Sequence, residues 1–142
     1  MTTKETLRQL LADSYTLNLK TQNYHWNVTG PMFSSLHTLF EAQYNEFFAA
    51  IDVIAERIKA LGDYAPGSYQ EYMKLTQIKE STGQLHWKDM VSQLLEGHEK
   101  IIATLKKSLA EGEHDDVSED LFIGRLDVHE KTAWMLRSIL AD

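Results

Sequence analysis

The chain contains no cysteine among its 142 residues. This absence excludes a disulfide framework, a zinc–thiolate site and a catalytic thiol. Any metal ion would have to be held by histidine, aspartate and glutamate side chains, which suit iron, manganese or zinc. The lack of cysteine also fits a reducing compartment, and we therefore expect a cytoplasmic protein.

Long apolar segments and an excess of basic residues are also missing. No run approaches the length of a membrane span, and the N-terminal sequence lacks the basic-then-apolar pattern of a signal peptide, so no membrane partner is expected. The formal net charge is −7, from 14 basic and 21 acidic residues. An acidic surface repels polyphosphate, and the composition therefore disfavours direct binding of nucleic acid.

Only two prolines occur, and no segment shows the alternating pattern of a β-strand. Helical periodicity predicts four long helices instead, over about residues 3–28, 34–61, 85–111 and 118–140. Thr2 and Glu5 have the spacing of a capping box before the first helix. Gly62 is expected to stop the second helix, and Ser118 is expected to cap the fourth.

The connection after the second long helix is too long for a tight turn, and residues 68–73 inside it could form a short helix. Two long helices, a long connection and two more long helices describe a ferritin-like arrangement. We therefore predict an all-α fold over residues 1–142, a single domain. It would be a ferritin-like four-helix bundle with a short extra helix in the connection between the second and third long helices.

The second long helix carries a line of metal-binding residue types beside its apolar stripe. At about 100° per residue, His37, Glu41, Asp52 and Glu56 lie on one side of the helix together with Phe48. The i,i+4 spacing lets Asp52 converge with Glu56, although like charges at this spacing cost a few tenths of a kcal/mol in an isolated helix. A solvated polar face would account for these residues. A cation between the carboxylates would also do so, because it would turn their repulsion into attraction.

One helix cannot bring all four of these residues to one ion, because Glu41 and Asp52 are about 16 Å apart along the axis. A second copy of the helix, antiparallel across a two-fold axis near positions 46 and 47, would place His37 opposite Glu56 and Glu41 opposite Asp52. Such an isologous contact generates two identical sites, each using both chains. This arrangement, one among several, predicts a homo-oligomer with shared metal sites.

A further candidate ligand lies at the end of the first helix. His25 is on the inward face, where a lone histidine is more often a hydrogen-bonded core residue than a ligand. Its surroundings change this expectation, because a helical hairpin turning through Gly30 and Pro31 would bring His25 close to His37. Neutral imidazoles and carboxylates together suit Fe(II) with open positions for an oxidant.

The residues around these positions resemble the signature of the Dps family of mini-ferritins. The similar segments are residues 25–33, 36–41, 52–58 and 61–62, which read HWNVTGPMF, LHTLFE, DVIAERI and LG. The order and lengths of the predicted helices also resemble those of the family over nearly the whole chain. A His-Trp pair, a second histidine twelve residues later and then Asp-x-x-x-Glu make a specific combination.

The resemblance implies that His25, His37 and Glu41 of one subunit and Asp52 and Glu56 of its neighbour are the metal-binding and catalytic residues. It implies a ferroxidase that oxidises Fe(II), with hydrogen peroxide preferred to oxygen, and an iron store that holds ferric mineral inside a shell of twelve subunits. Such a protein would protect against oxidative damage. Many members of the family have Asp where this chain has Glu41, which affects the weaker of two iron positions.

Two other functions remain open at this point. A DNA-compacting starvation protein, the role for which the family is named, often relies on a mobile basic tail. Here residues 1–4 are the expected tail, so we expect no DNA binding. A shell with an impaired metal site, kept for interaction or scaffolding, is supported only by Glu41.

The other histidines that we considered have structural explanations. Glu111 and His114 have the spacing of a Glu-x-x-His motif, but Gly112 lies between them where a helix ends, so we interpret the spacing as a coincidence. His98 and His129 lie on apolar helix faces, where hydrogen-bonded core histidines are the default.

Aromatic and acidic residues near the proposed sites have two interpretations each. Trp26 and Tyr44 would lie close to the metal, where their rings could trap oxidising equivalents or pack in an interface. An acidic stretch would favour the N-terminus of the fourth long helix through the helix dipole. By resemblance it could also line a three-fold pore for Fe(II). Its members are Asp115, Asp116, Glu119 and Asp120, with Asp127 as a further candidate.

Overall fold

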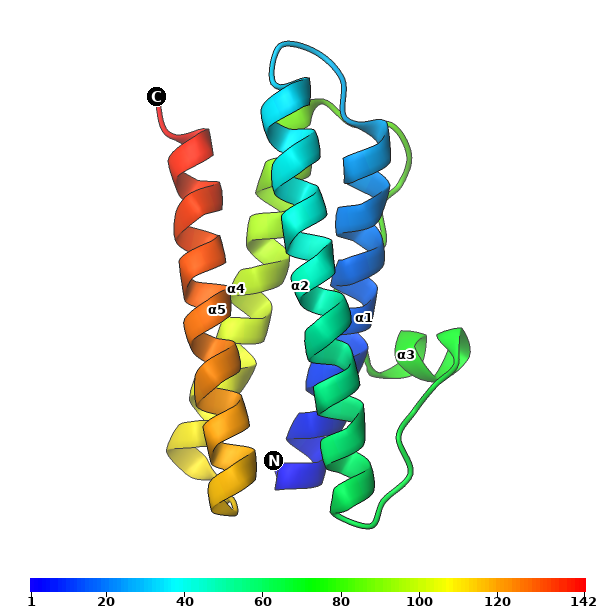
Figure 1. Cartoon of the computed structure of the whole chain (residues 1–142), viewed down its shortest axis with the longest axis vertical. Coiled ribbons are helices and arrows are strands. Elements are labelled where there is room, and N and C mark those ends of the chain that lie inside the picture. Colours follow the sequence, from blue (N-terminus) through cyan, green and yellow to red (C-terminus); the bar gives the residue numbers. More distant parts are fainter.

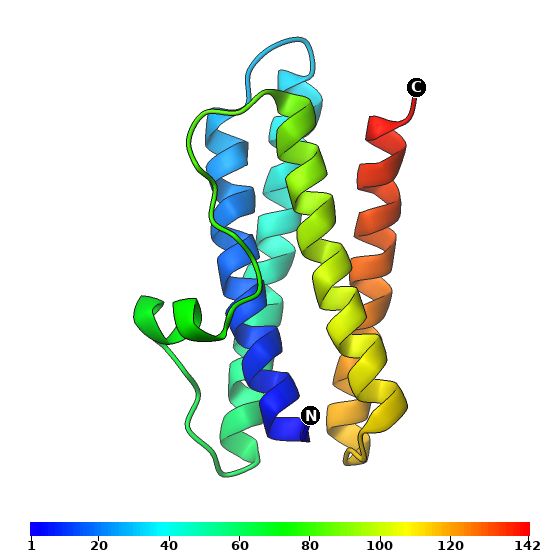
Figure 2. The same ribbon diagram turned by 180° about the vertical axis from the view of Figure 1, so that it is seen from behind.

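Five helices and no strands make up the computed structural model, which describes residues 1–142 (Figure 1). The helices are α1 (Thr3–Asn27), α2 (Phe33–Ala60), α3 (Tyr69–Leu75), α4 (Trp87–Glu111) and α5 (Asp116–Leu140). α1 and α2 pack as one antiparallel pair, and α4 and α5 pack as another. The connection that contains α3 runs along α1 to the opposite end of the bundle, where α4 begins (Figure 2). The predicted all-α ferritin-like fold is confirmed.

The helix ends agree with the expected ones to within two residues. The capping box of Thr2 and Glu5 is present at α1. The short helix predicted in the connection is α3, and the Ser68 side chain caps it. Gly30, with φ of +98°, forms the turn between α1 and α2 in a conformation that favours glycine. None of the helices is both long enough and apolar enough to cross a membrane.

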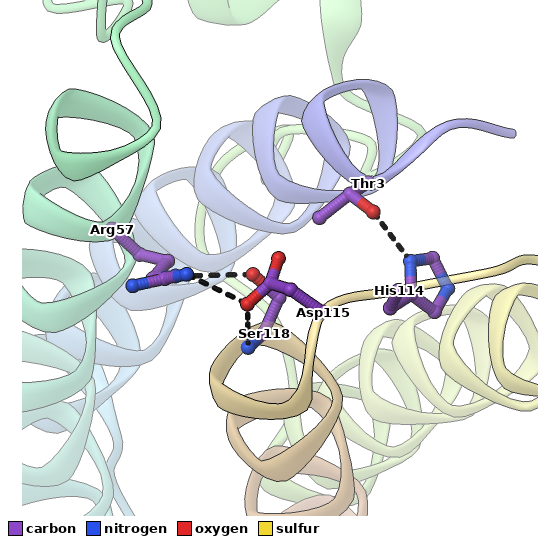
Figure 3. Close-up of polar contacts among 5 residues, drawn as sticks. All are labelled: Thr3, Arg57, His114, Asp115 and Ser118. Atoms are coloured by element: carbon purple, nitrogen blue, oxygen red, sulfur yellow. Dashed lines mark hydrogen bonds and ion pairs between the residues drawn. The ribbon is translucent and has the colours of Figure 1, made fainter.

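The cap of α5 differs from the prediction. The carboxylate of Asp115, not the hydroxyl of Ser118, caps the helix, and it accepts a hydrogen bond from the Ser118 backbone N–H at 2.9 Å. Ser118 is buried, and its Oγ accepts from Arg57 Nε, while Arg57 also pairs with Asp115 (Figure 3). Both residue types are good N-caps, and the position of Arg57 on α2 decides between them. Asp116 and Glu119 lie in the first turn of α5, as the helix dipole favours.

The connection is fastened to α1 by polar contacts. Asp13 on α1 is buried, and its carboxylate accepts hydrogen bonds from Thr76 Oγ1 at 2.8 Å and from the Gln77 backbone N–H at 2.7 Å. About two turns further along α1, Lys20 Nζ donates to the Lys79 carbonyl at 2.7 Å. These contacts hold the connection against the α1 side of the bundle.

Candidate metal centre

The middle of the bundle is one place where a ferritin-like fold can hold metal, because facing helices can direct Glu and His side chains inward. Here this layer contains His98, His129 and Arg125, all buried. Arg125 Nη2 donates to His129 Nε2 at 3.0 Å, since a guanidinium has no acceptor. The proton of neutral His129 is therefore on Nδ1, and it donates to His98 Nδ1 at 2.8 Å. The lone pairs of His129 Nε2 and His98 Nδ1 are thus occupied by hydrogen bonds, and Arg125 adds a positive charge beside them. This layer is therefore not the metal centre.

Burial also determines the charge of this histidine pair, which confirms that both are core residues. Burial and the nearby Arg125 charge lower the pKa of His98 from 6.5 to about 3. Burial, followed by the His98 and Arg125 charges, lowers the pKa of His129 well below 6.5. Both imidazoles are therefore neutral at pH 7 in the folded protein.

We expect the free energy of unfolding to fall as the pH is lowered from 6.5 toward 3. In this window the unfolded chain binds protons on His98 and His129 that the folded chain does not bind. Each histidine then removes up to about 1.4 kcal/mol of stability for each pH unit. Urea unfolding across this range measures the slope. His98→Leu should flatten it, and His86→Leu at an exposed position should not. An unchanged slope in His98→Leu would contradict the assignment.

His25 and His37 are brought together by the α1–α2 hairpin, as predicted. Their rings stack with centroids 3.9 Å apart. His25 Nδ1 lies 2.7 Å from the His37 carbonyl oxygen, and His37 Nδ1 lies 2.7 Å from the His25 carbonyl oxygen. A carbonyl oxygen only accepts, so each Nδ1 carries a proton and donates it. Both Nε2 atoms consequently keep a free lone pair, the arrangement by which a backbone carbonyl orients a metal-ligating histidine.

Aromatic side chains enclose this histidine pair. The Tyr44 and His25 rings meet edge to face at a centroid distance of 5.2 Å, and Phe33 stacks on His37 at 4.9 Å. Trp26 is 61% exposed. Glu41, one turn after His37 on α2, is also exposed, so its carboxylate is accessible from outside the subunit. The histidine pair is therefore held rigidly, and Glu41 lies on an open surface.

Asp52 and Glu56 converge on the same helix, as their spacing predicted. A hydrogen bond that the protonated Glu56 carboxyl donates to Asp52, together with the negative charge of Asp52, raises the pKa of Glu56 above its ordinary value of 4.5. Both side chains are exposed. The two like charges therefore lie close together on the surface, and a cation would relieve their repulsion.

One subunit alone does not form a complete site. No group of three or more histidine and acidic side chains within the chain could hold a metal ion. The exposed side of α2 includes Glu41, Asp52 and Glu56, and in its middle lies Phe48, which is 51% exposed. The opposite side of α2 is buried in the bundle. This exposed side of α2 therefore presents candidate ligands that do not form a complete site within one chain.

His114 has a structural role at the end of the bundle. Its Nε2 lies 3.0 Å from the Ser108 carbonyl oxygen, and its Nδ1 lies 2.7 Å from Thr3 Oγ1 (Figure 3). These bonds tie the start of α1 to the link between α4 and α5. The Glu-x-x-His spacing of Glu111 and His114 is thus explained without a metal.

Sequence reasoning missed the role of Arg125. An arginine on an otherwise apolar helix face does not reveal its contacts, because its partners His129 and Glu46 lie one turn away and on another helix. It also missed the reciprocal carbonyl bonds of His25 and His37. The only available signal for them was the Gly30-Pro31 turn between the two histidines.

The ferritin-like domain model matches residues 4–142 of this chain. The chain is 37% identical over 138 residues to the DNA protection during starvation protein 2 of Bacillus anthracis, with 96% of this chain and 94% of that protein covered. It is 36% identical over 144 residues to the DNA protection during starvation protein of Helicobacter pylori, with 99% and 100% covered. The chain belongs to the Dps family of ferritin-like proteins.

Solved Dps structures have the same fold. Dps from Staphylococcus aureus superimposes with a TM-score of 0.92 at 34% identity, covering 99% of this chain and 95% of that one. Dps from Vibrio cholerae, described as a member of a broad superfamily of ferritin-like diiron-carboxylate proteins, gives a TM-score of 0.92 at 30% identity, covering 98% and 89%. In this Dps-family protein Glu41, Asp52 and Glu56 are exposed on α2, and the stacked His25–His37 pair lies at the α1–α2 hairpin.

Proposed function

We propose that this Dps-family protein is a ferroxidase that oxidises Fe(II) at sites shared by two subunits. The observation that carries the proposal is the division of the candidate ligands into two separate sets, one at the α1–α2 hairpin and one further along the exposed side of α2. One set is His25, His37 and Glu41, with two imidazole Nε2 lone pairs free. The other is Asp52 with Glu56. A two-fold copy of α2 would join one set from each subunit and complete two identical sites.

The chemistry of the two sets suits this substrate. Neutral imidazoles and carboxylates form a borderline-to-hard site that accepts Fe(II). Asp52 and Glu56 supply the negative charge that offsets the additional charge of Fe(III). A bound iron ion would also offset the mutual repulsion of Asp52 and Glu56. Each residue named here acts as a ligand, and none needs to transfer a proton during the electron transfer.

In the proposed reaction two Fe(II) ions each lose one electron, and one molecule of hydrogen peroxide gains both. Its O–O bond breaks and two hydroxide ions form, so electrons and atoms balance. The metal ions hold and polarise the peroxide while the ligands fix their positions. The ferric product would be stored as mineral inside a closed shell of twelve subunits. Iron and peroxide would thereby be removed together, which limits oxidative damage.

Anaerobic titration with Fe(II), followed by addition of peroxide, tests this function. Wild-type protein should bind Fe(II) saturably and oxidise it rapidly. His25→Ala with His37→Ala should slow oxidation by at least about a hundredfold, because the oriented imidazole ligands are lost. Asp52→Ala with Glu56→Ala should do the same. Light scattering should show intact shells for both, and exposed His86→Ala is the control that should oxidise iron normally. A wild-type shell that binds no Fe(II) would indicate an impaired metal site instead.

A gel-shift assay tests the alternative function of compacting DNA. We expect no retardation of duplex DNA at physiological ionic strength without divalent cations. The net charge of −7 on each subunit repels the phosphate backbone overall. Retarded DNA under those conditions would favour direct DNA binding, whatever the outcome of the iron titration.

A further inference from the structure

A cavity of about 220 Å³ lies between α1, α4 and the connection that precedes α4. It is on the side of α1 that faces α4, whereas the candidate metal centre is on the side that faces α2. Ile78 is its only apolar lining residue. Gly97 on α4 also lines it, and the absence of a side chain there accommodates Leu17 of α1, since a Cβ at this position would lie 2.6 Å from Leu17 Cδ1. The cavity is therefore a polar space between the three segments.

Lys20 is the buried charge of this cavity. The residue is only 7% exposed, and its Nζ donates one hydrogen bond, to the Lys79 carbonyl. An ammonium has three N–H donors, so two remain. Lys20 takes part in none of the ion pairs of the chain, so no carboxylate oxygen lies within 4.0 Å of its Nζ. A buried charge without a counter-ion is unfavourable unless a further partner binds it.

The other charged groups of the cavity offset the Lys20 charge only in part. Lys79 and Lys100 also line it, together with Glu80 and Glu96. Glu96 pairs with Lys100 at 3.5 Å. Burial lowers the pKa of Lys20, Glu96 opposes this shift, and the Lys100 and Lys79 charges add to it. Basic groups therefore outnumber acidic ones locally, although acidic residues exceed basic ones by 21 to 14 in the whole chain.

Neutral donors complete the lining. Tyr24 donates its hydroxyl proton to Gln93 Oε1 at 2.7 Å. This bond occupies the oxygen of the Gln93 amide and leaves its NH₂ group as the available donor. Thr82 adds a hydroxyl group from the connection. Donors from α1, α4 and the connection thus surround one space. Charges on the distant acidic surface repel an anion in this space only weakly, because salt screens charges over about 8 Å.

We propose that this cavity binds a phosphate-type oxyanion, either inorganic phosphate or the phosphoryl group of a small ester, held by Lys20, Lys79 and the Gln93 amide. The size is adequate, because a cavity of about 150 Å³ already holds a benzene ring. Several N–H donors from different elements match the several oxygens of a tetrahedral dianion. This site is separate from the proposed ferroxidase site and does not depend on it.

Calorimetric titration and thermal unfolding of the iron-free shell test the proposal. Inorganic phosphate should bind saturably and raise the unfolding midpoint, and chloride at matched ionic strength should not. Lys20→Met should be at least as stable as wild type without phosphate, since it removes the buried charge. It should bind phosphate at least about tenfold more weakly. Lys107→Met, an exposed lysine of α4 outside the cavity, should behave like wild type.

Adenosine 5′-monophosphate distinguishes the two sources of the oxyanion. Competition between this ester and inorganic phosphate would support a site open to phosphate esters, and binding of phosphate alone would support a site for the free ion. Equal phosphate affinity in wild type and Lys20→Met would mean an adventitious ion only and would overturn the proposal. Should Lys20→Met fail to fold, Lys79→Met at an exposed position takes its place, and unchanged phosphate affinity there would overturn it equally.

Discussion

Mixing two inactive variants should restore about a quarter of the wild-type rate of Fe(II) oxidation. One variant is His25→Ala with His37→Ala, and the other is Asp52→Ala with Glu56→Ala. After dissociation and random reassembly, about half of the two-fold pairs contain one chain of each kind. One of the two sites in such a pair then combines an intact histidine set with an intact carboxylate pair. The other site in that pair lacks both sets.

The result depends on ligands from two chains meeting in one site. A site formed within one chain could never be repaired by mixing, so shells that are shown to be mixed by mass spectrometry but stay inactive would refute the shared site. Each variant dissociated and reassembled alone is the control and should remain inactive. Both should still assemble. The substitutions are confined to the proposed ligand positions, and like charges at i,i+4 such as Asp52 and Glu56 repel each other in the wild type.

Phe48→Asp should abolish both assembly across α2 and rapid Fe(II) oxidation, although it leaves all the proposed ligands unchanged. Phe48 is 51% exposed in the middle of the exposed side of α2, close to the proposed two-fold axis. Its replacement would bring two like charges together across the axis and remove apolar contact area there. We expect oxidation to slow by at least about a hundredfold, because each site loses its second set of ligands.

Light scattering and stopped-flow oxidation measure the two effects on the same sample. Phe48→Leu is the matched control, since it keeps an apolar side chain at the same position and should remain assembled and active. A Phe48→Asp protein that keeps its oligomeric state and oxidises iron at the wild-type rate would place the subunit contact elsewhere. Loss of assembly with full activity would instead mean that one chain suffices for the reaction.

Local features of the sequence determined the helices and part of the site. The Thr2–Glu5 capping box and the apolar periodicity predicted the helix ends to within two residues, because caps and periodicity depend on neighbours along the chain. The convergence of Asp52 with Glu56 follows from i,i+4 spacing alone. The proximity of His25 and His37 followed from a hairpin whose turn is only a few residues long.

Only the tertiary structure decided contacts between helices. It made Asp115 the cap of α5 through Arg57, occupied the lone pairs of the core histidines through Arg125, and buried Lys20 beside the connection. It also fixed which nitrogen of His25 and His37 carries the proton. Spacing along one helix defines a face, but the rotation of that helix against its neighbours depends on how the whole core packs. The partners of a side chain on that face are therefore set by residues distant in the chain.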